Sequence, residues 1–447
     1  MPFSAGSKST STLNQLPLPQ EPHAPPLGGS FFYSHSLPLS HSMEPVILKR
    51  SEHNVSRKDI SSAAIKVLYR LKDEGYTAYI AGGGVRDLLL ERQPKDFDVA
   101  TNATPEQIRK MFRNCRLIGR RFRLAHILFR GEIIETATFR APVPDDETIH
   151  SDKIFSTADD GMVMRDNLFG TPEEDALRRD FSINALFYNI ADFSIIDYAG
   201  GLEDLKKKII RVIGDPDKRF AEDPVRMIRA ARFAGTLGFE IEPEAYASIC
   251  RNKDKLAMAA PSRMYEEVQK LFFCGHAKAV FQWLEKTDLL HPMFHDFSHW
   301  LDEDQARRNW VIQNLEQMDR WRKAGLRVHP ALLFALLFGE YHEYLIQQLV
   351  DSGISPHDAA RDAVHQHLQS MCRNVRVPKQ VIYQVSDIMS NQLRFNQKKG
   401  RRPQRFLQHK AFPDAFLYFK ISAKTHQRNP ELLAYWTDLR NSQKQKS

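Results

Sequence analysis

Two aspartates one residue apart, Asp96 and Asp98, follow three consecutive glycines in the stretch GGGVRDLLLERQPKDFDVA at residues 82 to 100. Side chains alternate between the faces of a strand, so both carboxylates are predicted to point the same way and Phe97 into a core. Paired carboxylates repel each other unless a cation joins them, and their hard oxygens suit Mg²⁺. Two metal ions held here could activate an attacking hydroxyl and neutralise a leaving pyrophosphate. A solvated strand end is the alternative for the pair taken alone.

The glycines, Gly82 to Gly84, stand between a predicted buried strand at 77 to 81 and a predicted helix at 85 to 92. Glycine lets backbone N–H groups approach a phosphate closely, at the helix end where the dipole favours anions. Arg86 could add a charge-assisted contact. The run matches neither GxxxxGK[ST] nor GxGxxG. The glycine run is informative because of its position. A candidate phosphate-binding segment and a candidate metal-binding segment follow each other in the sequence, separated by one short helix.

Further polar positions downstream could complete such a site. Glu135 lies in the otherwise apolar predicted strand IIETATF, where a buried charge is costly unless it is paired or bound to a metal. Asp180 and Asn184, within RRDFSINAL at 178 to 186, are four residues apart, so we expect them to share a helix face. An N-cap is the simpler interpretation of Asp180.

A polar stripe is predicted along the helix of EDPVRMIRAARF at 222 to 233. Its members, at intervals of three, are Asp223, Arg226, Arg229 and Arg232. An N-cap and a surface Asp–Arg salt bridge would explain them without a ligand. The functional alternative is that Asp and Arg together present an acceptor and donors to the edge of a nucleobase.

These segments, in this order, resemble the class II branch of the nucleotidyltransferase superfamily, which contains bacterial poly(A) polymerases and tRNA CCA-adding enzymes. The matching segments are GGGVRD at 82 to 87, DFD at 96 to 98, ETATFR at 135 to 140, RRDFSINAL at 178 to 186, and EDPVRMIRAARF at 222 to 233. The resemblance covers about residues 46 to 420. Within it the chain looks most like the bacterial poly(A) polymerase I group.

The resemblance implies a role for each matching residue. Asp96 and Asp98 would hold the catalytic metal ions, Mg²⁺ or Mn²⁺, with Glu135 assisting and Asp180 counted among the catalytic acids. The positions implied to bind the nucleotide are Gly82, Gly83, Arg86, Arg178, Arg179, Asn184, Asp223, Arg226, Arg229 and Arg232.

The C-terminal end carries the positive charge of the chain. From Asn391 onward 13 Lys and Arg oppose 3 Asp and Glu, whereas the whole chain has 63 and 55, a net charge of +8. Its centre is the basic segment KKGRRPQR, Lys398 to Arg405, flanked by Phe395 and Phe406. Such a segment attracts polyphosphate chains by counterion release; a solvated tail is the alternative. The predicted RNA-binding residues are Lys398, Lys399, Arg401, Arg402 and Arg405.

This grip on phosphates favours a general extender of RNA 3′ ends, and IGRRFRLAHILF at 118 to 129 resembles a stretch associated with bacterial poly(A) polymerases. We therefore predict template-independent transfer of AMP from ATP to RNA 3′ ends, with Asp223 and Arg226 reading the base. tRNA CCA addition is the alternative within the superfamily. RNA-degradation machinery is an expected partner, and a monomer the expected state.

Two alternatives come from other classes. The chain could be a catalytically silent RNA-binding protein that keeps the head as a scaffold, although the intact carboxylates argue against this. A metal-dependent phosphohydrolase is suggested by His357, Asp358, His365 and His367. We expect these to be surface residues, because no second matching His/Asp set accompanies them.

The elements that position these residues predict an α+β chain. No run of about 18 uncharged apolar residues is present, so no membrane span is expected. The four cysteines are single, without CxxC, which favours a reducing cytoplasm. The predicted parts are a disordered extension at 1–45 with Met43 as the hypothesised start, a nucleotidyltransferase α/β head with a mixed sheet at 46–185, a helical neck for base recognition at 186–275, a helical body for RNA binding at 276–395, and a basic C-terminal region at 396–447.

Overall fold

The computed structural model describes residues 44–119, 123–141 and 168–444. The predicted disordered extension lies outside these residues except for its last two positions, and the hypothesised start at Met43 lies outside them too. Residues 120–122 of IGRRFRLAHILF are likewise outside the described part of the chain.

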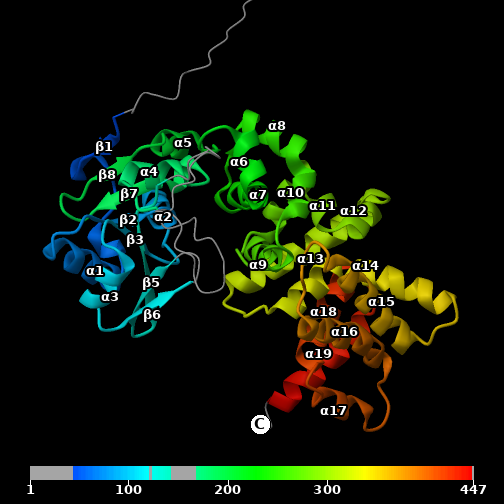
Figure 1. Cartoon of the computed structure of the whole chain (residues 1–447). Helices are drawn as coiled ribbons and strands as arrows, with labels where there is room; N and C mark the ends of the chain where they lie inside the picture. Colours follow the sequence, from blue (N-terminus) through cyan, green and yellow to red (C-terminus); the bar gives the residue numbers. More distant parts are fainter. Residues whose placement is uncertain (1–43, 120–122, 142–167, 445–447) are drawn as a thin grey trace, which may run out of the picture. The chain divides into compact units, whose positions relative to one another are not determined.

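A mixed sheet of eight strands organises the N-terminal part (Figure 1). The order across it is β1-β8-β7-β2-β3-β6-β5-β4. Neighbouring strands pair antiparallel except β3 and β6, which run parallel. The strands are β1 (Val46–Leu48), β2 (Ala78–Ala81), β3 (Asp98–Thr101), β4 (Cys115–Ile118), β5 (Leu124–Phe129), β6 (Glu132–Thr138), β7 (Leu186–Asn189) and β8 (Ile195–Asp197).

Both faces of the central strands are covered, because alternate residues along each strand enter two different cores. Ile80 and Val99 face the large core, to which helix α1 (Ser62–Asp73) contributes an apolar stripe. Ala81 and Ala100 face a smaller core that includes Phe139, Phe187 and Ala176 of helix α4 (Pro172–Leu177). The sheet is thus held from both sides, which fixes the strand ends where the polar residues of interest emerge.

The glycine run forms the turn between β2 and helix α2 (Gly83–Leu89). Gly82 has φ of +72° and donates its N–H to the carbonyl of Leu186 at 2.9 Å. The sequence predicted this helix at 85 to 92. Helix α2 therefore begins and ends a few residues earlier than predicted. Strand β3 begins at Asp98, which leaves Asp96 in the preceding loop rather than on the strand.

The sheet continues past the predicted end of the head at residue 185. Strand β7 pairs with β2, and β8 pairs with β1 and β7, so the sheet ends at Asp197. The segment after 185 was predicted as helical neck, and this is wrong for its first part. Leu186, Phe187 and Tyr188 of β7 are all buried, so the strand lacks the alternation of apolar and polar residues that would have marked it in the sequence.

The helices not yet named include one in the head, and helices dominate the described chain after the sheet. They are α3 (Pro105–Met111) in the head, followed by α5 (Gly201–Lys207), α6 (Pro216–Glu222), α7 (Val225–Leu237), α8 (Pro243–Asn252), α9 (Pro261–Phe272), α10 (Ala277–Lys286), α11 (Leu290–Met293), α12 (His295–Asp302), α13 (Gln305–Lys323), α14 (Pro330–Asp351), α15 (Pro356–Met371), α16 (Lys379–Ser390), α17 (Arg402–Leu407), α18 (Phe412–Thr425) and α19 (Pro430–Lys444). The short 3₁₀ helices are η1 (Arg50–Glu52), η2 (Arg57–Asp59), η3 (Ser182–Asn184), η4 (Lys253–Met258) and η5 (Asn391–Asn396). A two-stranded parallel pair, β9 (Ile209–Ile210) with β10 (Glu240–Ile241), precedes and follows α7.

Helix α7 packs closely on α10. At Gly235 a Cβ atom would lie 2.7 Å from the backbone nitrogen of Val280. Only glycine permits this approach, so the position of α7 is fixed by backbone contact as well as by apolar packing.

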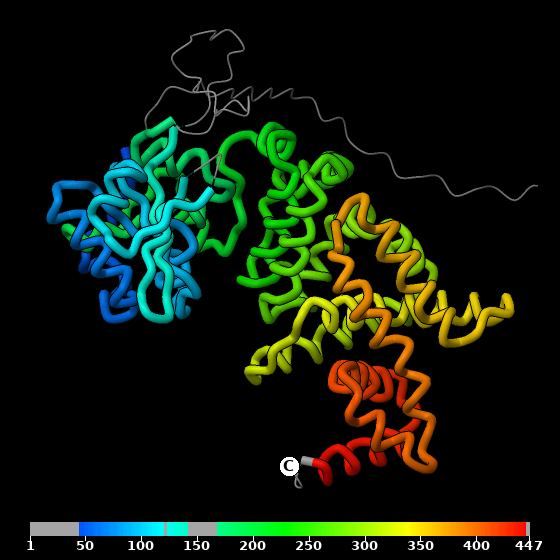
Figure 2. Tube along the Cα trace, turned by 60° about the horizontal axis from the view of Figure 1, so that its bottom comes forward, coloured from blue at the N-terminus to red at the C-terminus, as the bar shows by residue number. Residues whose placement is uncertain are grey.

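The basic C-terminal region is folded up to Lys444, not a solvated tail. Helices α17 to α19, drawn in orange and red in Figure 2, and the preceding η5 enclose an aromatic cluster. Phe395 and Phe406 are buried in this cluster with Trp436, whose indole N–H donates to the carbonyl of Phe395 at 2.8 Å. These two rings are therefore structural and not available to stack on bases.

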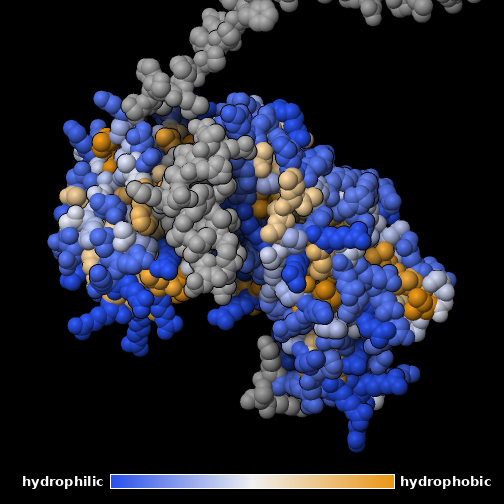
Figure 3. All heavy atoms as spheres, viewed as in Figure 1, coloured by the Kyte–Doolittle hydropathy of each residue, from blue (hydrophilic) through white to orange (hydrophobic). Residues whose placement is uncertain are grey.

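Hydrophilic residues dominate the face seen in Figure 3, with hydrophobic residues in small groups. Across the part of the chain that the structure describes, no helix is long and apolar enough to cross a membrane.

Candidate active site

A cleft of about 1390 Å³ opens between the carboxylate-bearing strands of the head and helices α7 and α9. Its walls bring together segments from residue 81 to residue 322. Every predicted catalytic residue and every predicted nucleotide-binding residue except Gly82 lines it. The sequence motifs thus converge in one place.

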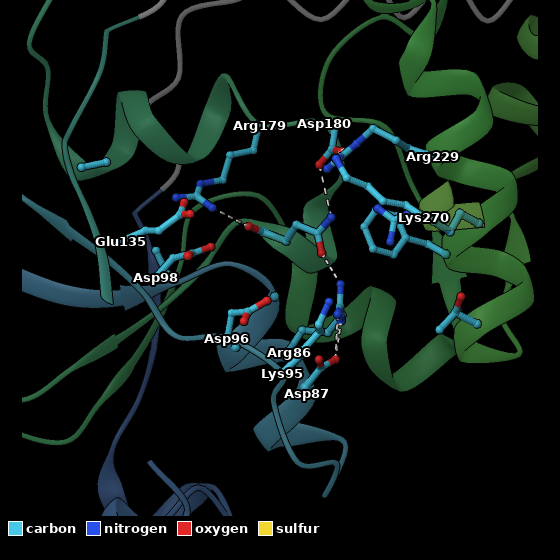
Figure 4. A pocket seen from close by; sticks show the side chains of 18 of the residues that line it. Arg86, Asp87, Lys95, Asp96, Asp98, Glu135, Arg179, Asp180, Arg229 and Lys270 are labelled. Carbon is cyan, nitrogen blue, oxygen red and sulfur yellow. Dashed lines mark hydrogen bonds and ion pairs between the residues drawn. The ribbon is translucent and has the colours of Figure 1, made fainter. Parts of the chain in front are cut away.

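Three carboxylates, those of Asp96, Asp98 and Glu135, form one wall (Figure 4). Asp98 and Glu135 are partners in the parallel pairing of β3 with β6, which sets their side chains next to each other. His126 is the antiparallel partner of Glu135 on β5, and its Nε2 lies 3.6 Å from Oε1 of Glu135. The sequence pattern suggested that Glu135 is a buried charge. Its side chain is in fact half exposed, so that reason for selecting it is wrong.

The carboxylate wall changes the proton affinity of Asp98. Loss of hydration in the cleft, together with the negative charges of Glu135 and Asp96, raises the pKa of Asp98 to about 6. The guanidinium of Arg179 opposes this shift. A carboxyl group crowded in this way gains most when a cation is bound beside it, and oxygen donors of this kind fit Mg²⁺ or Mn²⁺.

Asp180 lies apart from the carboxylate wall and faces Arg229 of α7 (Figure 4). Its Oδ2 accepts from Arg229 Nε at 2.6 Å, and its Oδ1 accepts from Asn184 Nδ2 at 3.2 Å and from the N–H of Phe181 at 2.9 Å. Burial alone would raise the pKa of Asp180, but the ion pair and hydrogen bonds hold it below its ordinary value. Asp180 and Asn184 do meet, through a hydrogen bond around η3 and not along an α-helix face.

Arg178 and Arg179 are both held by the buried carboxylate of Asp175. Arg178 donates from Nε to Oδ1 at 3.0 Å, and Arg179 donates from Nη2 to Oδ2 at 2.9 Å. Arg179 also donates from Nη1 to the carbonyl of Asn184 at 3.2 Å. A Cβ at Gly82 would lie 2.6 Å from that Nη1. A side chain at Gly82, whose φ is +72°, would therefore strain the backbone and displace the end of the Arg179 side chain.

Arg86 is buried at the base of α2 and already has protein partners. It donates from Nη1 to Asn184 Oδ1 at 2.6 Å and from Nε to Asp87 Oδ1 at 2.8 Å. Its guanidinium lies 5.1 Å from the centre of the Phe233 ring. It therefore joins α2 to the RRD segment and to α7.

The polar stripe of α7 does not form the predicted Asp223–Arg226 pair. Asp223 instead accepts two hydrogen bonds from Arg263 of α9, at 2.9 and 2.8 Å. Arg226 donates to Glu222 Oε2 and to the carbonyl of Arg219, both at 2.9 Å.

Further along the stripe, Arg232 lies over the ring of Phe233 at 4.4 Å. Burial and the nearby Arg229 lower the pKa of Arg232. The stripe therefore presents cations along one side of the cleft.

Sequence reasoning missed several residues that shape the cleft. Asp175 could have been found, because it stands three and four residues before the two arginines it binds. Arg219 and Arg263 had no local signal. Arg219 donates to the carbonyls of Arg178 and Arg179 at 2.6 and 2.8 Å from about forty residues away.

The basic segment is exposed at each of its Lys and Arg positions. The histidines behind the phosphohydrolase alternative do not form a cluster among the described residues. His367 is buried and its Nδ1 lies 2.9 Å from Nε2 of His342, so the expectation of a surface residue is wrong there. His357 and Asp358 are exposed neighbours on α15.

Comparison with known proteins places this geometry in a family. Residues 78–211 match the family model described as poly A polymerase head domain, 238–301 match the probable RNA and SrmB-binding site of polymerase A, and 352–447 match the polymerase A arginine-rich C-terminus. A poly(A) polymerase I from Salmonella typhi is 45% identical over 396 residues, covering 87% of this chain and 84% of the relative. The chain belongs to the poly(A) polymerase I family. A family member from Haemophilus influenzae is 37% identical over 398 residues, covering 87% of this chain and 86% of the relative.

The CCA-adding enzymes are more distant. One from Lactobacillus helveticus is 38% identical over 231 residues, which is 52% of this chain and 55% of that enzyme. Among solved structures, the CCA-adding enzyme of Bacillus stearothermophilus in complex with CTP has a TM-score of 0.59 at 24% identity, covering 86% of this chain and 82% of that one. This likeness shows the fold. The predictions of an α+β nucleotidyltransferase fold and of a poly(A) polymerase in preference to a CCA-adding enzyme are confirmed.

Proposed function

We propose that this member of the family transfers AMP from ATP to RNA 3′-hydroxyl groups without a template. The observation that supports this most is one cleft in which Asp96, Asp98 and Glu135 face guanidinium groups of the RRD segment and of α7. Phosphoryl transfer needs carboxylates that can hold Mg²⁺ and cations that can hold a polyphosphate. This cleft has both.

Asp96 and Asp98 are the residues we assign to the metal ions, with Glu135 beside them. When bound, Mg²⁺ or Mn²⁺ neutralises charge on the attacking and leaving oxygens of the displacement. In the displacement, the 3′ oxygen of the RNA bonds to the α-phosphorus of ATP and the bond to the β-phosphate oxygen breaks. The hydroxyl proton is lost to solvent and pyrophosphate leaves.

The triphosphate is assigned to the backbone of the Gly82 to Gly84 turn and to the arginines near it. Arg178 and Arg179 are oriented by Asp175, so their geometry is set before a nucleotide binds. Arg86 uses part of its five-donor guanidinium on Asp87 and Asn184, and its remaining N–H groups are what it can offer to a phosphate.

Base recognition is assigned to Asp223, which lies between α6 and α7, and to Arg226 of α7. Asp223 can accept from an adenine amino group, and Arg226 can donate to a ring nitrogen. Because Arg263 already holds Asp223 by two hydrogen bonds, this side chain is preorganised and adenine must share its oxygens with Arg263. The replacement Arg263→Gln, which removes the guanidinium group and its charge, is therefore expected to weaken discrimination among nucleotides more than it slows AMP addition.

The basic segment is assigned to the RNA strand upstream of its 3′ end. Its Lys and Arg side chains are exposed on a folded scaffold, which is suited to a sequence-independent grip on phosphates. Lys398, Lys399, Arg401, Arg402 and Arg405 are the residues proposed to make these contacts.

The test uses purified protein with Mg²⁺, each nucleoside triphosphate singly, and either an unstructured RNA or a tRNA that ends before CCA. Long extension of the unstructured RNA with ATP alone supports the proposal. Addition confined to C, C and A on the tRNA refutes it. RNA binding without any extension would favour the catalytically silent alternative.

A matched pair of variants tests the carboxylate assignment. Glu135→Gln removes a charge from the cleft wall, whereas Glu132→Gln removes one from the same strand at a position outside the cleft. We expect only the first to slow AMP addition. Asp96→Asn and Asp98→Asn are each expected to abolish it, and residual extension by the double variant would refute the metal assignment.

A further inference from the structure

A second group of metal-ligating side chains lies on α11 and α12, away from the catalytic cleft. His291 is on α11, and His299 and Asp302 stand three residues apart on α12, so they share one helix face. One donor atom from each lies within 4.8 Å of the others. Within the described ranges no other trio of His, Cys, Asp or Glu has its donor atoms this close. The donor atoms of the three carboxylates in the catalytic cleft are farther apart than this.

Hydrogen bonds fix which nitrogen of His291 faces the group. Ser298 Oγ has one proton, which it donates to the carbonyl of His295 at 2.8 Å. The same oxygen lies 2.9 Å from His291 Nδ1, and when Ser298 donates to the carbonyl its oxygen accepts the Nδ1 proton, which is the tautomer that metal binding through Nε2 requires. In the neutral ring, Nε2 then carries a lone pair.

That lone pair lies among carboxylate oxygens. His291 Nε2 is 3.1 Å from Asp302 Oδ2 and 3.7 Å from Asp288 Oδ1. Either an Nε2–H···O hydrogen bond from the neutral ring or a cation between the two atoms accounts for a distance this short. The structure therefore offers two explanations that an experiment can separate.

The spacing suits a small divalent cation. In a tetrahedral site with zinc–ligand bonds of about 2.0–2.1 Å, the donor atoms are about 3.4 Å apart. The His291–Asp302 distance is already close to this, and His299 is an exposed side chain that can rotate inward. Arg308 of α13 holds the other oxygen of Asp302 at 2.7 Å, which orients the carboxylate.

Space for a further ligand is also present. A cavity of about 60 Å³ adjoins the group and is lined by His291, Asp302 and Asp288. This is enough for a water molecule. Three protein ligands and one water form a common arrangement around zinc.

We propose that His291, His299 and Asp302 bind one divalent transition-metal ion of the zinc type. Imidazole ligands favour such ions over Mg²⁺, so the site would differ in metal preference from the oxygen-lined catalytic cleft. The ion would tie α11 to α12 and, through Arg308, to α13. This proposal does not depend on the proposed reaction.

The test titrates the chelator-treated full-length protein with Co²⁺ in excess Mg²⁺, which occupies the catalytic carboxylates. Tetrahedral Co²⁺ with nitrogen ligands absorbs visible light far more strongly than octahedral Co²⁺ with oxygen ligands. We expect one equivalent of the strongly absorbing form, displaced by Zn²⁺. Ser298→Ala, which removes the orienting hydrogen bond, should weaken binding about 10- to 100-fold.

Two exposed histidines on α12 provide a matched pair. His299→Gln should abolish the tetrahedral spectrum, whereas His295→Gln, one turn away and outside the trio, should keep it. Both variants should fold like the wild type. The proposal is overturned if the wild type gives no tetrahedral spectrum, if His299→Gln retains it, or if His295→Gln loses it. Absence of binding together with a His291 ring protonated on Nε2 in NMR spectra would identify the hydrogen-bond explanation.

Discussion

Metal binding at the cleft carboxylates should depend on pH in a range where an ordinary aspartate is fully ionised. Asp98 has a pKa raised to about 6, first by desolvation and then by Glu135 and Asp96. A carboxyl group with a pKa near 6 is about 90% ionised at pH 7 and about 10% at pH 5, whereas an ordinary aspartate is still about 90% ionised at pH 5. Because the metal binds the ionised form, affinity should fall about tenfold from pH 7 to pH 5.

The assay is Mn²⁺ binding followed by electron paramagnetic resonance, without ATP, since the triphosphate itself titrates in this range. The His299→Gln background removes any contribution of the second site. Glu135→Gln should shift the pH dependence to lower pH, because a neighbouring negative charge that raises the pKa of Asp98 is lost. Glu132→Gln should leave the profile unchanged.

Equal Mn²⁺ affinity at pH 5 and pH 7 in the parent protein would refute the reasoning. So would a pH profile that Glu135→Gln does not move, since the second-largest cause of the raised pKa would then be misassigned.

Three further predictions concern the supports of the site. Asp175→Ala should lower the free energy of unfolding, measured in urea, by about 3–5 kcal/mol, because two guanidinium groups lose their buried partner; a change below about 1 kcal/mol would contradict this. Gly82→Ala, at φ of +72° and against Arg179, should cost about 1–3 kcal/mol and abolish AMP addition, an outcome that full activity would exclude. Replacing all five Lys and Arg of the basic segment by Gln should reduce the slope of log affinity for single-stranded RNA against log salt by about 3–4, and an unchanged slope would remove the segment from the RNA contact.

The parts of the site that lie within one strand or turn could be predicted from the sequence. The positions of Asp98, Phe97 and the glycine turn follow from local geometry, and the structure agrees with them. Glu135 was identified for a wrong reason. It pairs in register with Asp98 across β3 and β6, and register between strands almost forty residues apart is not encoded in either strand alone.

Partners distant in the sequence were beyond prediction for the same reason. The Asp223–Arg226 spacing allowed a local salt bridge, but Arg263 on another helix offers a bidentate geometry that the local pair lacks. The C-terminal region shows a related limit. Its composition indicated a charged tail, whereas a few buried aromatic residues, Trp436 among them, were enough to fold it.

The strand order of the head has a consequence for synthesis on the ribosome. Strand β2, which leads into the glycine turn, pairs on one side with β3 and on the other with β7, which begins more than a hundred residues later. Among the strands that the structure describes, β1 pairs with β8 alone. Until residue 197 has emerged, the nascent chain exposes one edge of β2 and leaves β1 without a partner. The head should therefore fold late during translation, with the carboxylates of the cleft made early and assembled only when the distant strands arrive.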